Sequence, residues 1–431
     1  MDVAIAGAGI SGLAAAISLR RSGHRVTIYE RSSMNNELGA AINIPPNVSR
    51  FLVPWGLDPV RSRLVNSQGM WFVSPTTLEE IAAFDHSHNN EKFGSPLYYA
   101  HRVDLHESLK RMATEPGFGT PVEIRLKSIV TSYDSGTPSL TLQDGTIITA
   151  DVILAADGVN SIASQAILGK VNAPEPAKHS NCCYRFLISR EQLMSDPETK
   201  WFTEGHQSLG CRIYPDHQAN RRLVSYTCRD HEVFNFVGIC HNNTVFSKEK
   251  EDWLAPIDKS EVLAQFSGYS PKLLAIISKA TEVKRWPLLY RSPIRTWQKG
   301  KMAVAGDAAH PMLPHQGQGG AQGIEDGVAF GLVFQGVTDK SQIRNRLELY
   351  EKIRRNRAAS VQILSNFGAD EEVPHELVEY LDGVALPKNV ADIVNITYGH
   401  DVIKHATKVL KDYSPEWELG KDFYPAKIAV A

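Results

Sequence analysis

The sequence begins with DVAIA at residues 2–6, GAGISG at residues 7–12 and LAAAISLRRSG at residues 13–23. A short apolar run, a glycine-rich turn and a segment with helical spacing of its apolar residues predict a strand, a tight turn and a helix. The next run, RVTIYE at residues 25–30, alternates and is rich in β-branched residues, which predicts a second strand. The sequence therefore predicts a β-α-β unit and, with it, a Rossmann-like, doubly wound α/β domain.

Each glycine of the turn has a structural role that a larger residue could not fill. Gly7 makes the tight turn, Gly9 lets a pyrophosphate approach the backbone, and Gly12 lets the helix pack closely on the strand. The N-terminus of the helix then faces the phosphate charge. Glu30 ends the second strand, where its carboxylate accepts hydrogen bonds from ribose hydroxyls and would repel a 2′-phosphate. The pattern predicts a resident FAD or NAD, against the alternative of a glycine-rich turn without a ligand.

The bulk properties narrow the class of protein. A length of 431 residues favours two or three domains. The formal net charge of −2 argues against nucleic acid as a partner. The five cysteines form no C-x-x-C pair, which argues against a metal centre and favours free thiols. No run approaches the roughly 20 apolar residues that span a bilayer, so we expect a cytoplasmic protein without a membrane span.

Alternating segments fill the middle of the sequence, among them CCYRFLI at residues 182–188, LGCRIYP at 209–215 and RLVSYTCR at 222–229. Polar turns separate these segments, which predicts a mostly antiparallel sheet. A short apolar strand pattern returns at residues 302–305, so we expect the nucleotide-binding domain to be discontinuous. The expected domains are a nucleotide-binding domain (1–72, 96–172 and 285–367), an inserted β-sheet substrate domain (73–95 and 173–284) and a helical C-terminal region (368–431).

A second glycine-rich constellation follows that strand. GDAAHP at residues 306–311 and QGQGGAQGIED at residues 316–326 predict a strand end, a proline-bounded loop and the start of a helix. Exposed backbone N–H groups at Gly319 and Gly320 would suit the electron-rich edge of a reduced flavin. Asp307 would then hold ribityl hydroxyls; the alternative is a solvated aspartate before a proline turn.

At this point the sequence resembles the group A FAD-dependent aromatic monooxygenases, the family of para-hydroxybenzoate hydroxylase and salicylate hydroxylase. The resemblance runs from residue 2 to about residue 365. It is carried by the N-terminal glycine turn, by ADGVNS at residues 156–161 and by Gly306-Asp307. The family commonly has an arginine where this chain has Ser164. The resemblance implies further cofactor contacts from the segment Leu38–Asn43 that covers the FAD, from Arg102 and from Asp157; the expected FAD-binding residues are Gly7, Gly9, Gly12, Glu30, Arg31, Ala41, Arg102, Asp157, Asp307, Gly319 and Gly320.

The resemblance also implies the reaction. FAD would be resident, and NADPH or NADH would bind transiently because no second glycine fingerprint exists for it. With O2, and through a flavin C4a-hydroperoxide, such an enzyme hydroxylates a phenolic or aromatic acid substrate in aromatic degradation or in secondary-metabolite (polyketide) tailoring. We expect a monomer or homodimer whose partners are the small aromatic substrate, O2 and NAD(P)H.

Two residues of the alternating segments are the expected catalytic residues. By resemblance to salicylate-hydroxylase-like enzymes, Arg185 would hold the substrate anion and Tyr214 would donate a hydrogen bond to it, with both side chains in one cavity. The alternatives are an ordinary strand arginine and a core tyrosine. His310 and His315 flank the proline-bounded loop between Gly306-Asp307 and Gly319, which we call the flavin loop. We interpret both histidines as structural residues more readily than as proton relays.

Other functions on the same fold stay open from the sequence. They are a dearomatising or Baeyer-Villiger monooxygenase, an FAD oxidase, a flavin-dependent halogenase and an FAD-binding protein that has lost its activity. The tryptophan-rich motif of flavin halogenases is missing from the sequence. An oxidase would differ in that the substrate itself reduces the flavin.

Overall fold

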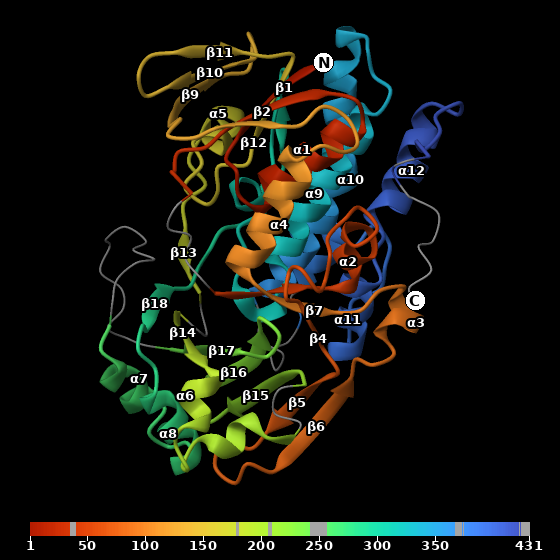
Figure 1. Ribbon diagram of the computed structural model, residues 1–431. Coiled ribbons are helices and arrows are strands. Elements are labelled where there is room, and N and C mark those ends of the chain that lie inside the picture. Colours follow the sequence, from red (N-terminus) through yellow and green to blue (C-terminus); the bar gives the residue numbers. More distant parts are fainter. Residues whose placement is uncertain are drawn as a thin grey trace.

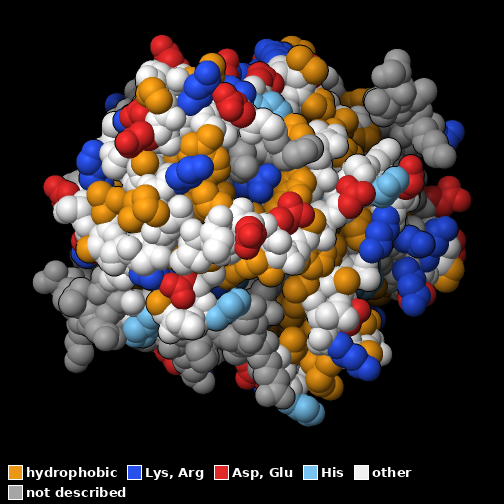
Figure 2. All heavy atoms as spheres, turned by 90° about the horizontal axis from the view of Figure 1, so that it is seen from below, with side chains coloured by type: hydrophobic (Ala, Val, Ile, Leu, Met, Phe, Trp, Pro, Cys, Tyr) orange, Lys and Arg blue, Asp and Glu red, His pale blue; other side chains and the backbone are white. Residues whose placement is uncertain are grey.

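The chain is built around two large sheets, which lie in the upper and lower halves of the computed structural model in Figure 1. The structure describes residues 1–34, 40–177, 181–205, 209–241, 257–366, 373, 375–421 and 423. The face seen from below carries charged side chains of both signs spread among hydrophobic ones (Figure 2).

The first sheet is the expected doubly wound sheet. Its six strands lie in the order β20-β21-β12-β1-β2-β8. Every neighbouring pair is parallel except β20 and β21. The strands are β1 (Asp2–Ala6), β2 (Arg25–Tyr29), β8 (Glu123–Arg125), β12 (Val152–Ala155), β20 (Gln298–Lys299) and β21 (Met302–Val304). Parallel strands end at one edge, so the loops that follow them meet there.

Long helices cover this sheet: α1 (Ile10–Arg21), α4 (Arg102–Thr114), α9 (Gly319–Phe334) and α10 (Ile343–Ser365). The backbones of α1 and α9 are in close contact, because a Cβ atom added at Gly331 would lie 2.6 Å from the backbone carbonyl carbon of Ser18 and 1.9 Å from the Ser18 hydroxyl oxygen. That hydroxyl donates a hydrogen bond to the Val328 carbonyl at 3.1 Å. The large hydrophobic core of the protein forms between these helices and the first sheet.

The second sheet has seven strands in the order β18-β14-β17-β16-β15-β5-β6. It is mostly antiparallel, as expected; only β15 and β5 pair in parallel. The strands are β5 (Gly69–Val73), β6 (Glu80–Asp85), β14 (Cys182–Ser189), β15 (Cys211–Asp216), β16 (Arg221–Cys228), β17 (Val233–Cys240) and β18 (Lys284–Pro287). The expected domain boundaries at residues 72 and 285 therefore fall inside β5 and β18.

The two faces of the second sheet differ. One face packs against short helices and forms a second, aromatic-rich core. These helices are α6 (Arg190–Met194), η1 (Lys200–Thr203), α7 (Lys259–Gln265) and α8 (Pro271–Ser278). The other face contacts the first domain, since Arg185, Tyr226 and Asn235 on it bond to Ala41.

Smaller elements connect these two parts. The three-stranded sheet of β3 (Ala41–Ile44), β7 (Tyr98–His101) and β4 (Val65–Asn66) lies between the two large sheets in Figure 1. The others are β9 (Val130–Asp134), β10 (Ser139–Leu142), β11 (Ile147–Thr149), β13 (Glu175–Pro176), β19 (Leu289–Tyr290), α2 (Pro46–Leu52), α3 (Asn89–Phe93), α5 (Ala163–Leu168), η3 (Gly306–Ala308), η4 (Pro314–Gln316) and η5 (Lys340–Gln342).

The C-terminal region is helical, as expected, with η6 (His375–Tyr380), α11 (Val390–Tyr398) and α12 (Val402–Tyr413). Buried Val402, Ile403, Ala406 and Leu410 of α12 join the core of the first domain. Trp55 donates a hydrogen bond from its indole nitrogen to the Phe423 carbonyl at 2.7 Å. Among the helices described, none combines the length and the apolar character that crossing a membrane requires.

Candidate active site

Four expected cofactor residues lie just beyond the carboxyl ends of neighbouring parallel strands. Gly7 follows β1, Glu30 follows β2, Asp157 follows β12 and Asp307 follows β21. The strands are in register, because Ala6 pairs with Ala155 and Ala155 pairs with Val304. The fold therefore brings together residues that are up to 300 positions apart in sequence, at the edge where doubly wound sheets bind their ligands.

The first glycine loop has the shape that a pyrophosphate requires. Gly7 has a φ of +97°, and a Cβ atom there would lie 2.4 Å from the Ala156 carbonyl oxygen. A Cβ atom at Gly12 would lie 2.0 Å from the Gly7 carbonyl oxygen. At Gly9, in contrast, a Cβ atom would meet nothing within 4 Å. Open space in front of the N-terminus of α1 fits the phosphates of FAD at that position.

Glu30 and Arg31 lie beside this loop. The Glu30 carboxylate accepts hydrogen bonds from the amides of Ala8 at 2.7 Å and Ser32 at 2.8 Å. It is thereby fixed where ribose hydroxyls would approach. Arg31 is exposed. Burial raises the pKa of Asp157, while the Tyr133 hydroxyl, which donates to Asp157 at 2.7 Å, and the positive charge of Arg31 oppose that rise.

Asp307 lies in η3, directly after the strand end. Its side chain is exposed, yet desolvation by the surrounding protein raises the pKa of its carboxyl group. An exposed side chain with protein around it lies in a concave part of the surface. The charge of Arg102 opposes the rise in pKa, so this arginine lies near Asp307. The Arg102 amide donates to the Ala40 carbonyl at 2.7 Å, which fixes the start of α4 beside β3.

The segment expected to cover the FAD, Leu38–Asn43, is described from Ala40 onward and continues into strand β3, which we call the cover strand; Leu38 and Gly39 lie outside the described residues. The glycine-rich N-terminus of α9 lies against β3, because a Cβ atom at Gly320 would lie 2.7 Å from the Ile42 side chain. At Gly319 the nearest neighbour of such a Cβ atom, Met312, is 4.0 Å away. The N–H groups at the N-terminus of α9 therefore lie next to the cover strand. This position is compatible with the expectation that they face the flavin.

The second sheet holds the cover strand through the peptide groups of Ala41. Arg185 on β14 donates from Nη2 to the Ala41 carbonyl at 3.0 Å, and the Tyr226 hydroxyl on β16 donates to the same oxygen at 3.2 Å. The Ala41 amide donates to the side-chain oxygen of Asn235 at 3.3 Å. Arg185 also lies over the Trp286 ring, 4.8 Å from its centroid, and its Nε is buried without a hydrogen-bond partner.

The structure does not bring Tyr214 together with Arg185. Tyr214 pairs with Leu223, which is three positions before Tyr226, so Tyr214 lies on the opposite face of the sheet from Tyr226 and Arg185. It is 1% exposed within the aromatic core, where burial raises the pKa of its hydroxyl. The expectation that Tyr214 shares a cavity with Arg185 is corrected: on the domain-facing side, Tyr226 is the tyrosine near Arg185.

Comparison with known proteins decides the family. The profile of the FAD-binding domain family matches residues 1–364. The FAD-dependent monooxygenase cfoG of Aspergillus candidus is 46% identical over 427 residues, covering 98% of each chain. The chain belongs to the FAD-dependent monooxygenases. Hispidin-3-hydroxylase of Neonothopanus nambi is 31% identical over 423 residues, covering 95% of this chain and 96% of its own.

The expected resemblance to group A aromatic monooxygenases is confirmed, and with it FAD as the cofactor. The structure of salicylate hydroxylase in complex with its substrate has the same fold, with a TM-score of 0.74 at 21% identity over 95% of this chain and 98% of that one. Ser164 stands where the family commonly has an arginine. Its hydroxyl donates to the Ala308 carbonyl at 2.9 Å and so ties α5 to the loop of Asp307.

A buried charge network lies behind the loop of Asp307, and the sequence analysis did not predict it. Asp326 accepts hydrogen bonds from the Gly306 amide at 2.8 Å, from His310 at 2.5 Å and from Arg354 at 2.8 Å. Glu325, fully buried, pairs with Arg354 at 2.5 Å and with Arg357 at 3.1 Å. Burial alone would raise the pKa of Glu325, but the two arginines hold it below its usual value.

The two histidines of the flavin loop, His310 and His315, both contact other protein groups. His310 is buried, bonds to Asp326 and stacks on Trp297 at a centroid distance of 5.2 Å. Nδ1 of His315 is in contact with the guanidinium of Arg222 on β16. Burial and the charge of Arg222 lower the pKa of His315 to about 3. This neutral histidine links the flavin loop to the second sheet.

Proposed function

We propose that this monooxygenase uses NADH or NADPH and O2 to hydroxylate a phenolic or aromatic acid substrate that lies between the flavin loop and the second sheet. The observation that carries the proposal is the meeting of Arg185 and Tyr226 at the cover strand. Two proteins similar to this chain, hispidin-3-hydroxylase and 3-hydroxybenzoate 6-hydroxylase 1, have names that describe hydroxylations, and the second name gives a phenolic acid as the substrate, which supports the substrate class. We also propose a role in secondary-metabolite tailoring or in aromatic degradation, the two settings that the family resemblance implies.

The surroundings of Arg185 suit an aromatic anion. On the same face of the sheet, Cys183, Val237 and Ile239 form an apolar cluster with Leu313 of the flavin loop. An apolar lining with a few polar groups is typical of small-molecule sites. The buried Nε of Arg185 is free to donate, and a cation beside a phenol lowers the pKa of the phenol. The resulting phenolate is a more electron-rich ring and accepts an oxygen atom more readily.

The residues at the carboxyl edge of the first sheet would each hold a different part of FAD. Bound FAD supplies the transfer of electrons from the nicotinamide and the activation of O2. The N-terminus of α1 would hold the pyrophosphate, Glu30 a ribose and Asp307 the ribityl chain. The N–H groups at Gly319 and Gly320 would stabilise negative charge on the flavin pyrimidine. Tyr226 would orient the cover strand and, through it, the distance between substrate and flavin.

The test is anaerobic stopped-flow reduction of the bound FAD by NADH and by NADPH, with and without each member of a panel of phenolic acids. We expect reduction to accelerate when an effective substrate binds. Arg185→Ala should weaken that effect by about 10- to 150-fold, the loss of one charge-assisted hydrogen bond of roughly 1.5–3 kcal/mol. Arg185→Lys should retain part of it, and Arg344→Ala, at an exposed arginine of α10, should change nothing. Equal reduction rates with and without all ligands would contradict the proposal.

A further inference from the structure

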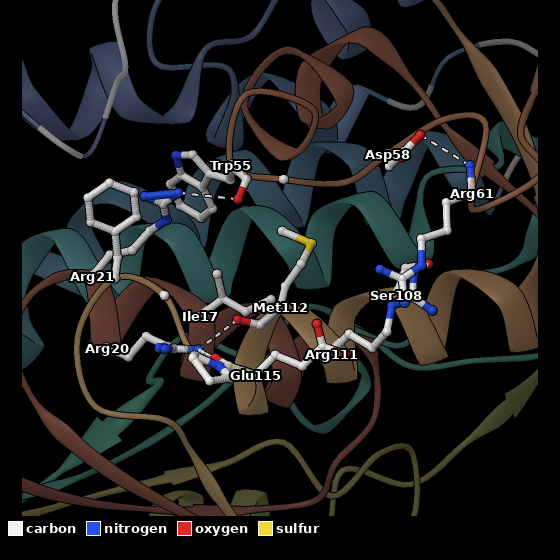
Figure 3. Close-up of a pocket in the computed structure, with 14 residues that line it drawn as sticks. Ile17, Arg20, Arg21, Trp55, Asp58, Arg61, Ser108, Arg111, Met112 and Glu115 are labelled. Carbon is white, nitrogen blue, oxygen red and sulfur yellow. Dashed lines mark hydrogen bonds between the residues drawn. The ribbon is translucent and has the colours of Figure 1, made fainter.

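A cavity of about 320 Å³ lies on the far side of the first domain from the flavin edge. The end of α1, the loop after α2, and the last turns of α4 with the loop that follows it form its walls (Figure 3). The α1 helix has 12 residues and begins at the first glycine loop. At 1.5 Å per residue, the part of α1 that lines the cavity, from Ile17 to Arg21, is about 12–18 Å from that loop. A molecule in this cavity therefore does not occupy the flavin site.

One end of the cavity is an arginine end. In Figure 3, Arg61 and Arg111 extend toward Ser108, and Arg111 donates to the Ser108 hydroxyl at 3.1 Å. Neither arginine forms an ion pair with a carboxylate of the described chain. The nearby Asp58 carboxylate already accepts the amides of Val60 at 2.9 Å and Arg61 at 3.1 Å. Two guanidinium groups in one cavity repel each other, and an anion between them would remove that repulsion.

The other end of the cavity is an aromatic end. The Arg21 guanidinium lies 5.1 Å from the Trp55 ring centroid and 4.7 Å from that of Phe118. Phe118 is 54% exposed, so part of its ring is open to a ligand in the cavity. Trp55 is only 7% exposed, so a flat ring of a ligand would stack on the exposed part of Phe118, where the Arg21 cation already holds the two aromatic side chains together.

The fourth arginine of the cavity is used by the fold. Arg20 donates to the carbonyl oxygens of Met112 at 3.0 Å, Ala113 at 2.8 Å and Glu115 at 2.9 Å. It thereby satisfies the C-terminal end of α4, whose partial charge is negative. An anion would thus bind at the arginine end, where Arg61 and Arg111 have no such carbonyl partners.

We propose that this cavity binds a nucleoside monophosphate, with its phosphate between Arg61 and Arg111 and its base on the aromatic end formed by Arg21, Trp55 and Phe118. The phosphate takes charge-assisted hydrogen bonds from two guanidinium forks. The base contributes stacking, and the cavity volume lies at the lower end of the range of ligand sites, which begins at about 300 Å³. The site is independent of the hydroxylation proposed above.

The test is isothermal titration calorimetry of the FAD-saturated enzyme at low salt with AMP, adenosine and inorganic phosphate. We expect AMP to bind at least tenfold more tightly than either of the other two. The double variant Arg61→Gln/Arg111→Gln should weaken AMP binding about 100-fold. Phe118→Ser should weaken binding of AMP but not of phosphate. The matched control is Arg344→Gln, an exposed arginine outside the cavity, which should leave all three affinities unchanged.

Three results would overturn the proposal. The first is AMP binding that the double variant leaves unchanged, which would place the nucleotide elsewhere, for example at the flavin edge. The second is the absence of AMP binding at millimolar concentration. The third is equal affinity for phosphate and AMP with no effect of Phe118→Ser, which would make the cavity a simple anion site. FAD content and the rate of NAD(P)H oxidation should be the same in all variants, because none of these residues lies at the flavin edge.

Discussion

The proposed site draws on two regions that differ, the carboxyl edge of the first sheet and the domain-facing side of the second sheet. At the edge, the place of a residue in the sequence shows whether it can reach the site, because every loop that follows a parallel strand lies at the same edge of the sheet. On the second sheet, the register of the strands decides which side chains can reach the site, because successive side chains point to opposite faces. A motif that follows a strand is therefore informative on its own, whereas a residue within an antiparallel strand is informative only once its face is known.

The largest expected effect concerns the charge network behind the carboxyl edge. Arg354→Met leaves Glu325 and Asp326 with fewer partners in a fully buried position. Removing one partner of a buried ion pair costs about 3–5 kcal/mol, so the free energy of unfolding should fall by that amount. The control is Arg344→Met, at an exposed position of the same helix, which should change stability by less than about 0.5 kcal/mol. Denaturant unfolding that shows equal effects would contradict the network.

Substitutions at Gly12 and Gly9 distinguish an effect on packing from an effect on cofactor binding at the carboxyl edge. Gly12→Ala places a Cβ atom 2.0 Å from the Gly7 carbonyl oxygen, and such overpacking should cost about 1–3 kcal/mol of stability. Gly9→Ala meets only open space. It should leave the melting temperature of the FAD-free protein unchanged and weaken FAD binding. FAD content and thermal unfolding measure the two effects; a Gly9→Ala protein with full FAD affinity would contradict the pyrophosphate position.

A buried histidine, His86, directly follows strand β6 of the second sheet, and its charge state can be tested with pH. Burial lowers the pKa of His86, at the end of β6, to about 4. The unfolded chain binds this proton near pH 6.5, so stability is complete above that pH and is lost as the pH falls toward 4. Between pH 7 and pH 5 the loss should be about 2 kcal/mol. His86→Gln should flatten the pH dependence of denaturant unfolding by that amount; an unchanged slope would show that the folded protein binds the proton.

The smallest effect distinguishes the two faces of the second sheet. Tyr226→Phe removes a hydroxyl that donates to Ala41, a neutral hydrogen bond of about 0.5–1.5 kcal/mol. It should change the KM for the phenolic substrate or the coupling of NAD(P)H oxidation to product by about 2- to 10-fold. Tyr214→Phe, in the core on the other face, should change neither. A kinetic effect of Tyr214→Phe as large as that of Tyr226→Phe would reverse the assignment of faces.

The sequence predicted the edge in detail because its residues are tied to strand ends. Gly7, Glu30, Asp157 and Asp307 each follow a short apolar run that is legible as a strand. The sequence did not predict Tyr226. The alternation in RLVSYTCR does not show which face of the sheet its tyrosine lies on, because that depends on the register with the neighbouring strands. The error with Tyr214 has the same cause.

The charge network was missed for a different reason. Arg354 and Arg357 belong to a helix rich in charged residues, where most arginines are exposed. Only the packing of α10 on α9 shows that these two are buried, at 0% and 7% exposure, opposite Glu325 and Asp326. Contacts between helices leave no spacing signal in a single sequence, whereas the glycines at their close approach, such as Gly331, give only a weak one.

The most direct test of the central claim is the origin of the oxygen atom in the product. The enzyme, with NAD(P)H and the phenolic substrate that most accelerates flavin reduction, is supplied with ¹⁸O₂, and the product is analysed by mass spectrometry. A monooxygenase with its substrate held at Arg185 beside the flavin should place one ¹⁸O atom in each product molecule, and Arg185→Ala should shift the consumed O2 toward hydrogen peroxide. A product without ¹⁸O, formed together with an equal amount of hydrogen peroxide, would identify an oxidase and contradict the account.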